Sequence, residues 1–225
     1  MNNRLNRITL LLGSEKIKKL RQSCVMVVGC GAVGSFAVEA LARSGVGHIV
    51  LIDFDKVEES NINRQLFALE STIGKPKVEI AKQRILDINP ETKVDVLNIF
   101  FDENTVINIK PDYVIDAIDT VQSKIALYKW CFDNDVPFIS SMGAARKTDI
   151  SKIKIGKISK TTVCPLAAKI RRIVRDKKMK DFPVVYSVET ATPQVNGGRE
   201  YGSIITITGS FGLMLSDFVI KKLIS

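Results

Sequence analysis

The stretch Val25-Met26-Val27-Val28-Gly29-Cys30-Gly31-Ala32-Val33-Gly34 decides how this chain folds. Its first residues are a short β-branched run that ends at glycine, which predicts a buried strand over residues 25–29. Apolar residues with helical spacing follow over residues 32–43. Gly29, Gly31 and Gly34 form the pattern G-x-G-x-x-G, in which backbone N–H groups and the dipole of the following helix face an anion. The stretch therefore predicts a strand, a phosphate-binding loop and a helix.

The rest of the first half repeats this alternation of strand and helix. Strands are predicted over residues 48–53, 94–99, 113–118 and 137–141, and helices over residues 76–88 and 123–132. Such alternation is typical of a parallel sheet covered by helices on both faces. After residue 141 the pattern changes to strands over 152–158, 184–188 and 204–207 and helices over 166–179 and 211–223. We expect these to extend the same sheet with mixed or antiparallel pairing.

The predicted fold class is therefore α/β, a Rossmann-like three-layer fold. With 225 residues, 45% of them hydrophobic, the chain is long enough for one compact domain with a substantial core. We predict a single domain over residues 1–225, with a nucleotide-binding half at about 1–141 and a basic, substrate-binding half at about 142–225. The apolar stretch over residues 203–220 favours a buried strand and helix, and peripheral membrane association is left open.

Charge is concentrated in one segment of the chain. The net charge is +9, and residues 142–180 alone hold 13 Lys and Arg against two Asp, a net charge of +11. Charge placed so unevenly indicates a polyanionic partner more than general solubility. The four cysteines form no C-x-x-C pair, which argues against zinc ligation and favours a reducing, cytoplasmic location.

Acidic and basic residues follow the glycine loop in a fixed order. Asp53 ends the second predicted strand nineteen residues after Gly34, where a carboxylate can bind a ribose. To this point a dinucleotide-dependent dehydrogenase fits equally well. The cations Arg64 and Lys77 favour ATP, because cleavage of a triphosphate needs positive charge on the leaving pyrophosphate. A capped polar turn is the alternative for residues 61–65. The candidate ATP-binding residues are Gly29, Gly31, Gly34, Asp53, Asp55, Asn61, Arg64, Gln65, Lys77 and Asp119.

Two carboxylates follow the predicted strand over residues 113–118. Asp119 is expected to be exposed at the ligand-binding edge of the sheet, where it can hold Mg²⁺ together with phosphate. Asp116 either binds ligand or caps the turn. Near the N-terminus, Arg7 and Arg4 lie on a segment expected to be free, so that an arginine can complete a phosphate site in a neighbouring subunit; surface solubilisation is the alternative. His48 is interpreted as structural.

These pieces together resemble the ubiquitin-activating-enzyme-like adenylating family, which includes the activators of the molybdopterin and thiamine sulfur-carrier proteins. The matching stretches are residues 4–7, 29–35, 53–65, 74–77 and 116–119. The resemblance implies a homodimer in which Arg7 is donated across the interface. It also implies that Asp53 binds the ribose, Arg64 and Lys77 the phosphates and Asp119 the Mg²⁺. The catalytic set is then Arg7, Arg64, Lys77 and Asp119.

The second half is similar to the tRNA threonylcarbamoyladenosine dehydratase branch of this family. The similarity lies in residues 164–171, 185–189 and 202–223. It implies ATP-dependent closure of threonylcarbamoyladenosine, beside the tRNA anticodon, to its cyclic form through an acyl-adenylate. Cys164 stands where that branch usually has Asp, which puts the role of the position in doubt. The implied tRNA contacts are Lys169, Arg171, Arg172, Arg175, Lys177 and Lys178.

Two other functions compete with this one. An adenylyltransferase that activates the C-terminal glycine of a small sulfur-carrier protein uses the same chemistry, but its relatives generally carry paired zinc cysteines, which this chain lacks. A non-enzymatic or redox module that merely uses a nucleotide fold is the third hypothesis. The sequence does not identify the tRNAs used, the base that assists ring closure, any monovalent-cation site, or whether a sulfur-transfer protein is a partner.

Overall fold

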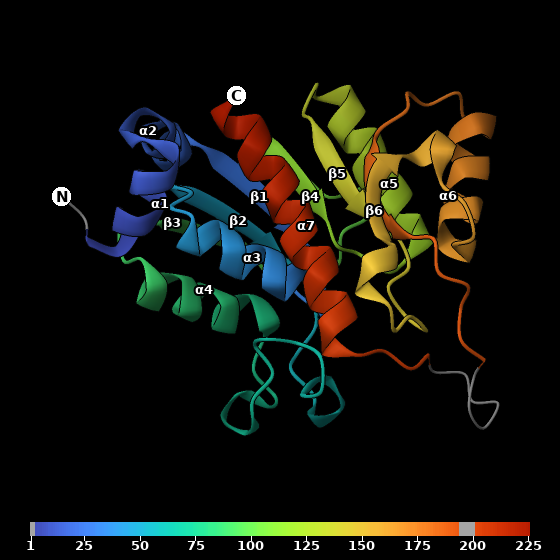
Figure 1. The fold of residues 1–225 in the computed structure, drawn as a ribbon, viewed down its shortest axis with the longest axis horizontal. Coiled ribbons are helices and arrows are strands. Elements are labelled where there is room, and N and C mark those ends of the chain that lie inside the picture. Colours follow the sequence, from blue (N-terminus) through green and yellow to red (C-terminus); the bar gives the residue numbers. More distant parts are fainter. Residues whose placement is uncertain (1–2, 194–200) are drawn as a thin grey trace.

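The computed structural model describes residues 3–193 and 201–225, which form a seven-stranded sheet in the order β3-β2-β1-β4-β5-β7-β6 (Figure 1). Six strands are parallel, and β6 is antiparallel to its neighbour β7 at one edge. The strands are β1 (Cys24–Val28), β2 (His48–Ile52), β3 (Lys93–Leu97), β4 (Tyr113–Asp116), β5 (Phe138–Ser141), β6 (Ile153–Lys157) and β7 (Pro183–Ser187). The α/β fold and the antiparallel extension predicted from the sequence are confirmed.

Helices pack on both faces of this sheet, so that β1 is buried on each side. Val25 and Val27 face α3 (Gly34–Arg43), α4 (Lys77–Ile88) and α7 (Ile205–Ile224), whereas Met26 and Val28 face α5 (Val121–Asp133) and α6 (Pro165–Asp176). A strand covered twice needs apolar residues at every position, which explains the continuous run in the sequence. Two hydrophobic clusters result, one on each face.

The predicted strand over residues 204–207 is wrong. These residues begin α7, a helix that packs along α3 and crosses the sheet beside β4, β5 and β7 (Figure 1). Short β-branched runs are compatible with either element by periodicity alone. These residues are helical because the buried positions of α7, from Ile207 to Ile224, recur with helical spacing on the side that packs against α3 and the sheet. None of the helices in residues 3–193 and 201–225 has the length and apolarity to cross a membrane. Every other predicted strand lies within two residues of its observed bounds.

The N-terminal segment was expected to be free, and this prediction is wrong. It forms α1 (Asn6–Leu12) and α2 (Ser14–Gln22) at the amino ends of the strands, where the N–H of Gly47 donates to the carbonyl of Leu20. Leu5 is buried and packs against Gly45. Arg7 is therefore held on an ordered helix. Only Ile17 and Leu20 of α2 are buried, so the polar sequence gave little signal of a helix.

Candidate active site

The carboxyl ends of β1, β2, β4 and β5 open into one cavity of about 630 Å³. Its walls are the loops that follow these strands, together with the start of α6 and part of the connection from β7 to α7. Ligands bind at this edge in parallel α/β sheets because the loops after the adjacent strands β1 and β4 lead to helices on opposite faces, which leaves a crevice between the loops. The cavity therefore lies where the sequence placed its candidate site.

The glycine loop is shaped by two close approaches. Gly29 has φ +95°, and a Cβ there would lie 2.7 Å from the carbonyl oxygen of Ala117. A Cβ at Gly34 would lie 1.7 Å from the carbonyl oxygen of Gly29. Side chains are thus excluded at both positions, and the loop turns tightly into α3. Val33 provides no side-chain cap, so the first turn of α3 keeps N–H groups available for an anion.

Asp53 is held at the end of β2 by backbone donors. The N–H of Cys30 donates to its Oδ2, and the N–H of Asp55 donates to its Oδ1 at 2.8 Å. Burial raises the pKa of the Asp53 carboxyl, and these two hydrogen bonds oppose that rise. The carboxylate is therefore fixed in orientation beside the glycine loop, within the wall of the cavity.

Lys77 reaches the cavity from the start of α4. Its ammonium lies 2.7 Å from Oδ2 of Asp55, and the lysine side chain is almost fully buried. Asp55 is partly exposed, so this ion pair stands at the boundary between protein and cavity. A phosphate that entered the cavity would compete with Asp55 for the same ammonium.

The polar loop after β2 serves both the fold and the cavity. Oδ1 of Asn61 accepts from the N–H of Glu58, so the capped turn that was the alternative interpretation is present. Nη1 of Arg64 donates to the carbonyl of Ser60 at 2.7 Å and to Oδ1 of Asn63 at 2.8 Å. Asn61, Arg64 and Gln65 also line the cavity, beside Lys77 and Asp53. Of the ten ATP-binding candidates predicted from the sequence, nine line this cavity, and Gly34 is buried beside it at the start of α3.

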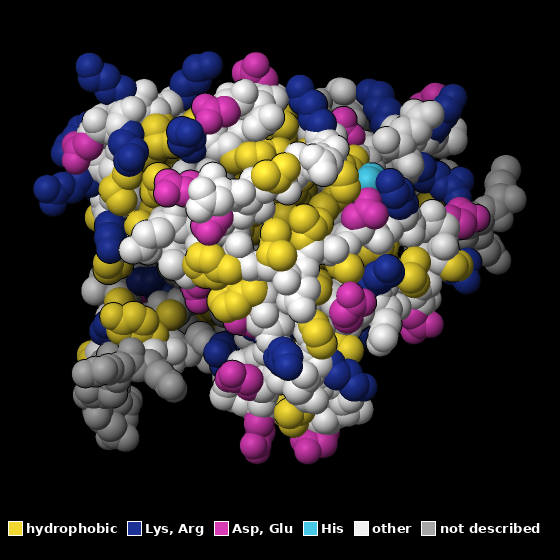
Figure 2. All heavy atoms as spheres, turned by 180° about the vertical axis from the view of Figure 1, so that it is seen from behind, with side chains coloured by type: hydrophobic (Ala, Val, Ile, Leu, Met, Phe, Trp, Pro, Cys, Tyr) yellow, Lys and Arg dark blue, Asp and Glu magenta, His cyan; other side chains and the backbone are white. Residues whose placement is uncertain are grey.

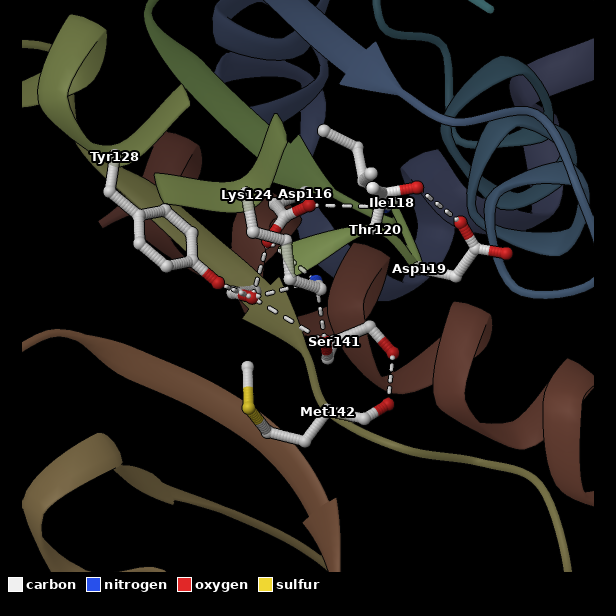
Figure 3. A network of polar contacts seen from close by, with 9 residues as sticks. Asp116, Ile118, Asp119, Thr120, Lys124, Tyr128, Ser141 and Met142 are labelled. Carbon is white, nitrogen blue, oxygen red and sulfur yellow. Dashed lines mark hydrogen bonds and ion pairs between the residues drawn. The ribbon is translucent and has the colours of Figure 1, made fainter. Parts of the chain in front are cut away.

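A buried ion pair lies beneath the cavity (Figure 3). Nζ of Lys124, on α5, is 2.7 Å from Oδ2 of Asp116 and 2.8 Å from the carbonyl oxygen of Ser141, and both charged side chains are fully buried. Oδ1 of Asp116 accepts from the N–H of Ile118, so Asp116 caps the turn, as one of its two interpretations proposed. Lys124 was not among the site residues predicted from the sequence. Its burial was indicated by its helical spacing from Leu127, Tyr128 and Cys131, which are the buried residues on the same face of α5.

Asp119 stands apart from this network, on the cavity side of the turn. It is exposed, lines the cavity and accepts from the hydroxyl of Thr120 at 3.1 Å (Figure 3). Within the described ranges, 3–193 and 201–225, no three His, Cys, Asp or Glu residues form a group that could hold a metal ion. A single carboxylate suits Mg²⁺ that is shared with nucleotide phosphates, because Mg²⁺ keeps most of its waters and needs few protein ligands.

Arg7 and the basic side chains of α6 lie outside the cavity. Arg7 is exposed on α1, at the opposite edge of the sheet from the carboxyl ends. Lys169, Arg172, Arg175, Lys177 and Lys178 are exposed on or just after α6, and Figure 2 shows Lys and Arg side chains gathered along the edge where α6 lies. Arg171 differs from them, because its Nη1 donates to both the carbonyl and the hydroxyl of Thr161 at 2.7 Å.

Several cavity residues were not singled out from the sequence as ligand contacts. Arg146 and Lys147 follow β5, Cys164 precedes α6, and Tyr201 lies on the connection into α7. Lys147 is buried and its ammonium donates to the carbonyl of Glu189. Ser123 Oγ is buried at the wall and has no hydrogen-bond partner within residues 3–193 and 201–225. The basic charge of segment 142–180 was the available signal for the two cations.

A tight glycine loop, a fixed acid and paired cations at one sheet edge define a nucleotide-binding α/β protein equipped for a polyphosphate. The chain belongs to the ThiF family, whose sequence pattern matches residues 3–225.

Its relatives include tRNA-modifying enzymes. It is 48% identical to tRNA threonylcarbamoyladenosine dehydratase of Bacillus subtilis over 194 residues, covering 84% of this chain and 76% of that protein. The crystal structure of the Escherichia coli tRNA N6-threonylcarbamoyladenosine dehydratase in complex with AMP superposes with a TM-score of 0.91 at 37% identity, covering 98% of this chain and 93% of that one. The same E. coli enzyme in complex with ATP also gives a TM-score of 0.91. Molybdopterin-synthase adenylyltransferase of E. coli is 37% identical over a shorter 146 residues, which cover 63% of this chain and 58% of that protein.

Proposed function

We propose that this chain is an ATP-dependent tRNA threonylcarbamoyladenosine dehydratase that forms the cyclic nucleoside beside the anticodon. The observation that carries the proposal is the likeness to the E. coli enzyme over 98% of this chain. In this proposal the two halves of the chain bind different substrates. Residues up to about 141 bind ATP, and the basic residues beyond them bind the RNA.

The chemistry needs the carboxylate of the substrate to become a good electrophile. That carboxylate attacks the α-phosphorus of ATP, the bond to the bridging oxygen breaks, and pyrophosphate leaves with its electron pair. A ureido nitrogen of the same modified base then attacks the acyl carbon of the acyl-adenylate, loses its proton and expels AMP. The nucleoside has lost the elements of water. The second step is intramolecular, so orientation replaces a high effective concentration and no cysteine intermediate is needed.

The candidate ATP-binding residues of the cavity have distinct roles in the first step. The glycine loop and the first turn of α3 hold phosphate oxygens, and Asp53 accepts hydrogen bonds from the ribose hydroxyls. Arg64 and Lys77 stabilise the negative charge that develops on the pyrophosphate, where removal of one fixed donor typically costs about 3 kcal/mol of barrier. Asp119 would hold Mg²⁺, which when bound shields the phosphate charges. Asn61, Gln65 and Asp55 position these groups.

We further propose a homodimer in which Arg7 completes the cavity of the partner subunit. Arg7 cannot serve its own cavity from the opposite edge of the sheet, and its helix α1 exposes Leu10 and Leu11. A second apolar surface supports association. Figure 2 shows hydrophobic side chains gathered on the face opposite α3, α4 and α7, and the segment between β3 and β4 exposes Ile99, Phe100 and Val106. A tRNA substrate and four free cysteines support a cytoplasmic location.

Activation of a sulfur-carrier protein is the second candidate, supported by the partial likeness to molybdopterin-synthase adenylyltransferase. The same cavity can adenylate a C-terminal glycine. Adenylation of a carrier protein does not require the basic residues on α6, whereas binding of an RNA does. Closure of the ring within one nucleoside needs no sulfur-transfer partner.

The deciding experiment is mass spectrometry of tRNA nucleosides after incubation with the purified chain and ATP. We expect loss of one water from threonylcarbamoyladenosine, with release of AMP and pyrophosphate. Arg64→Ala and Asp119→Ala variants should fold normally and lose this activity, and EDTA should abolish the activity of the parent chain. Pyrophosphate release that responds to a carrier protein and not to tRNA would select the second candidate instead. Full activity in EDTA would remove Mg²⁺ from the proposal.

A further inference from the structure

Arg146, at the exit of β5, has a backbone conformation that is rare for its residue type. Its φ is +59°, in the left-handed region that favours glycine. Three hydrogen bonds hold it there: its N–H donates to Gly202 at 2.8 Å, its carbonyl accepts from Thr192 at 3.0 Å, and its Nε donates to the Thr192 carbonyl at 2.7 Å. Residues in a strained backbone conformation that is held by several hydrogen bonds are found most often at ligand-binding sites.

These bonds bring Arg146 against an aromatic ring at the mouth of the cavity. The guanidinium carbon of Arg146 lies 5.8 Å from the ring centroid of Tyr201. Tyr201 is 64% exposed and yet lines the cavity together with Ser203 and Arg146. A cation beneath one face of the ring holds it, while much of the ring stays open to solvent. An exposed ring held in this way is a surface on which a flat base can stack.

The surroundings of Tyr201 favour an RNA base as the ligand. The start of α6, at Cys164 and Pro165, lines the same cavity. A second groove of about 510 Å³ runs along α6 and is lined by Arg172 and Arg175. Arg146 and Lys147 line the cavity, so positive side chains lie both in its wall and along α6. Phosphates of a single-stranded loop that followed this helix would bring one of their bases to the mouth of the cavity.

We propose that Tyr201, supported by Arg146, is a stacking platform for a nucleobase of the RNA substrate at the mouth of the cavity. The platform selects for unpaired loops, because a base within a duplex cannot present its face to a protein ring. This inference rests on the proposed function, since it requires RNA to be the substrate. It adds a residue that determines substrate binding and takes no part in ATP binding.

The test is steady-state kinetics of the full chain on an anticodon stem-loop that carries threonylcarbamoyladenosine. Tyr201→Leu keeps an apolar side chain and removes the aromatic face, so it should raise KM for the RNA about tenfold while kcat at saturating RNA and KM for ATP stay near parental values. Tyr201→Phe and Tyr201→Trp keep the face and should retain the parental KM. A Tyr201 that only supports the connection into α7 would instead change kcat and KM for ATP.

The failure of this inference differs from the failure of the proposed function. If the parent chain does not convert the stem-loop, the proposed function fails and the platform falls with it. If the parent converts it and Tyr201→Leu has the parental KM for RNA, the platform alone is wrong. The same conclusion follows if Tyr201→Phe is as weak as Tyr201→Leu, because stacking needs the ring and not its hydroxyl.

Discussion

The ammonium of Lys124 and the carboxylate of Asp116 lie 2.7 Å apart, with both side chains fully buried under the active-site cavity. Through its other bonds the pair joins two loops. Asp116 accepts from Ile118, in the turn that carries Asp119, and Lys124 donates to Ser141, just before the segment that carries Arg146 (Figure 3). The loops proposed to bind ATP and RNA are thus joined by one buried interaction.

Lys124→Met should destabilise the protein strongly. It leaves Asp116 buried without its counter-charge, which typically costs about 3–5 kcal/mol. Denaturant-induced unfolding measures the loss. Lys129→Met is the matched control on the same helix, because Lys129 pairs with Asp133 in an exposed position and its loss should leave stability unchanged. Equal stability of the two variants would show that Asp116 and Lys124 are not charged partners in solution.

The same residue shows where the sequence was insufficient. The glycine loop, Asp53 and Lys77 could be placed at the cavity because each lies at the end of a predictable strand or the start of a predictable helix, and Arg64 could be placed there because its polar loop joins β2 to α4. Lys124 could not, since a lysine within a helix ordinarily lies in water, and its burial depends on Asp116 from another element. Arg146 and Tyr201 are 55 residues apart in the sequence, and only the packed connection into α7 brings them together.

The beginning of α7 and the two N-terminal helices were missed for a different reason. Ile204-Ile205-Thr206-Ile207 has the composition of a strand, and only its packing against α3 makes most of it helical. Helix α1 has only seven residues and buries none of them, and α2 is mostly polar with only Ile17 and Leu20 buried, so neither has a strong apolar periodicity. Tertiary contact decides these elements, and local pattern does not contain that information.

ATP binding should weaken with falling pH through Asp53. Burial raises the pKa of this carboxyl, so it becomes protonated at a higher pH than an ordinary aspartate. The protonated form loses acceptor capacity for the ribose. Calorimetric titration of ATP as a function of pH should therefore show a loss of affinity in the parent that is absent in Asp53→Asn, which binds weakly throughout. The nucleotide's own titration affects both proteins equally, and parallel pH profiles would contradict the assigned role.

The same shift has a defined effect on stability. Because the folded-state pKa of Asp53 lies above its unfolded value, the charged carboxylate costs stability above the unfolded pKa, and the cost is relieved as the pH falls through the folded pKa. Asp53→Asn should thus raise the melting temperature at neutral pH and have less effect in acid. A lower melting temperature at neutral pH would mean that the hydrogen bonds from Cys30 and Asp55 outweigh burial.

Arg7 and Arg64 should complement each other in mixed dimers. Arg7→Ala and Arg64→Ala are each expected to be inactive. In a heterodimer of the two, one cavity contains the intact Arg64 of its own chain and the intact Arg7 of the partner, so activity should return. Two differently tagged copies, co-expressed and purified through both tags, provide this heterodimer. If Arg7 acted within its own chain, each cavity would lack one arginine and the heterodimer would stay inactive.

Arg172 and Arg175 should contribute RNA affinity that depends on salt. Both are exposed on α6 and share Asp176, at 3.7 Å and 3.3 Å, in ion pairs that water and phosphate can readily replace. Arg172→Gln with Arg175→Gln should lower the slope of log affinity against log salt by about 1–2 and leave ATP binding unchanged. Lys16→Gln with Lys18→Gln, on exposed positions of α2, removes the same charge far from α6 and controls for net charge. Arg171 is left intact because its bonds to Thr161 make it part of the fold. Equal slopes for the two double variants would mean that the RNA responds to overall charge and does not lie along α6.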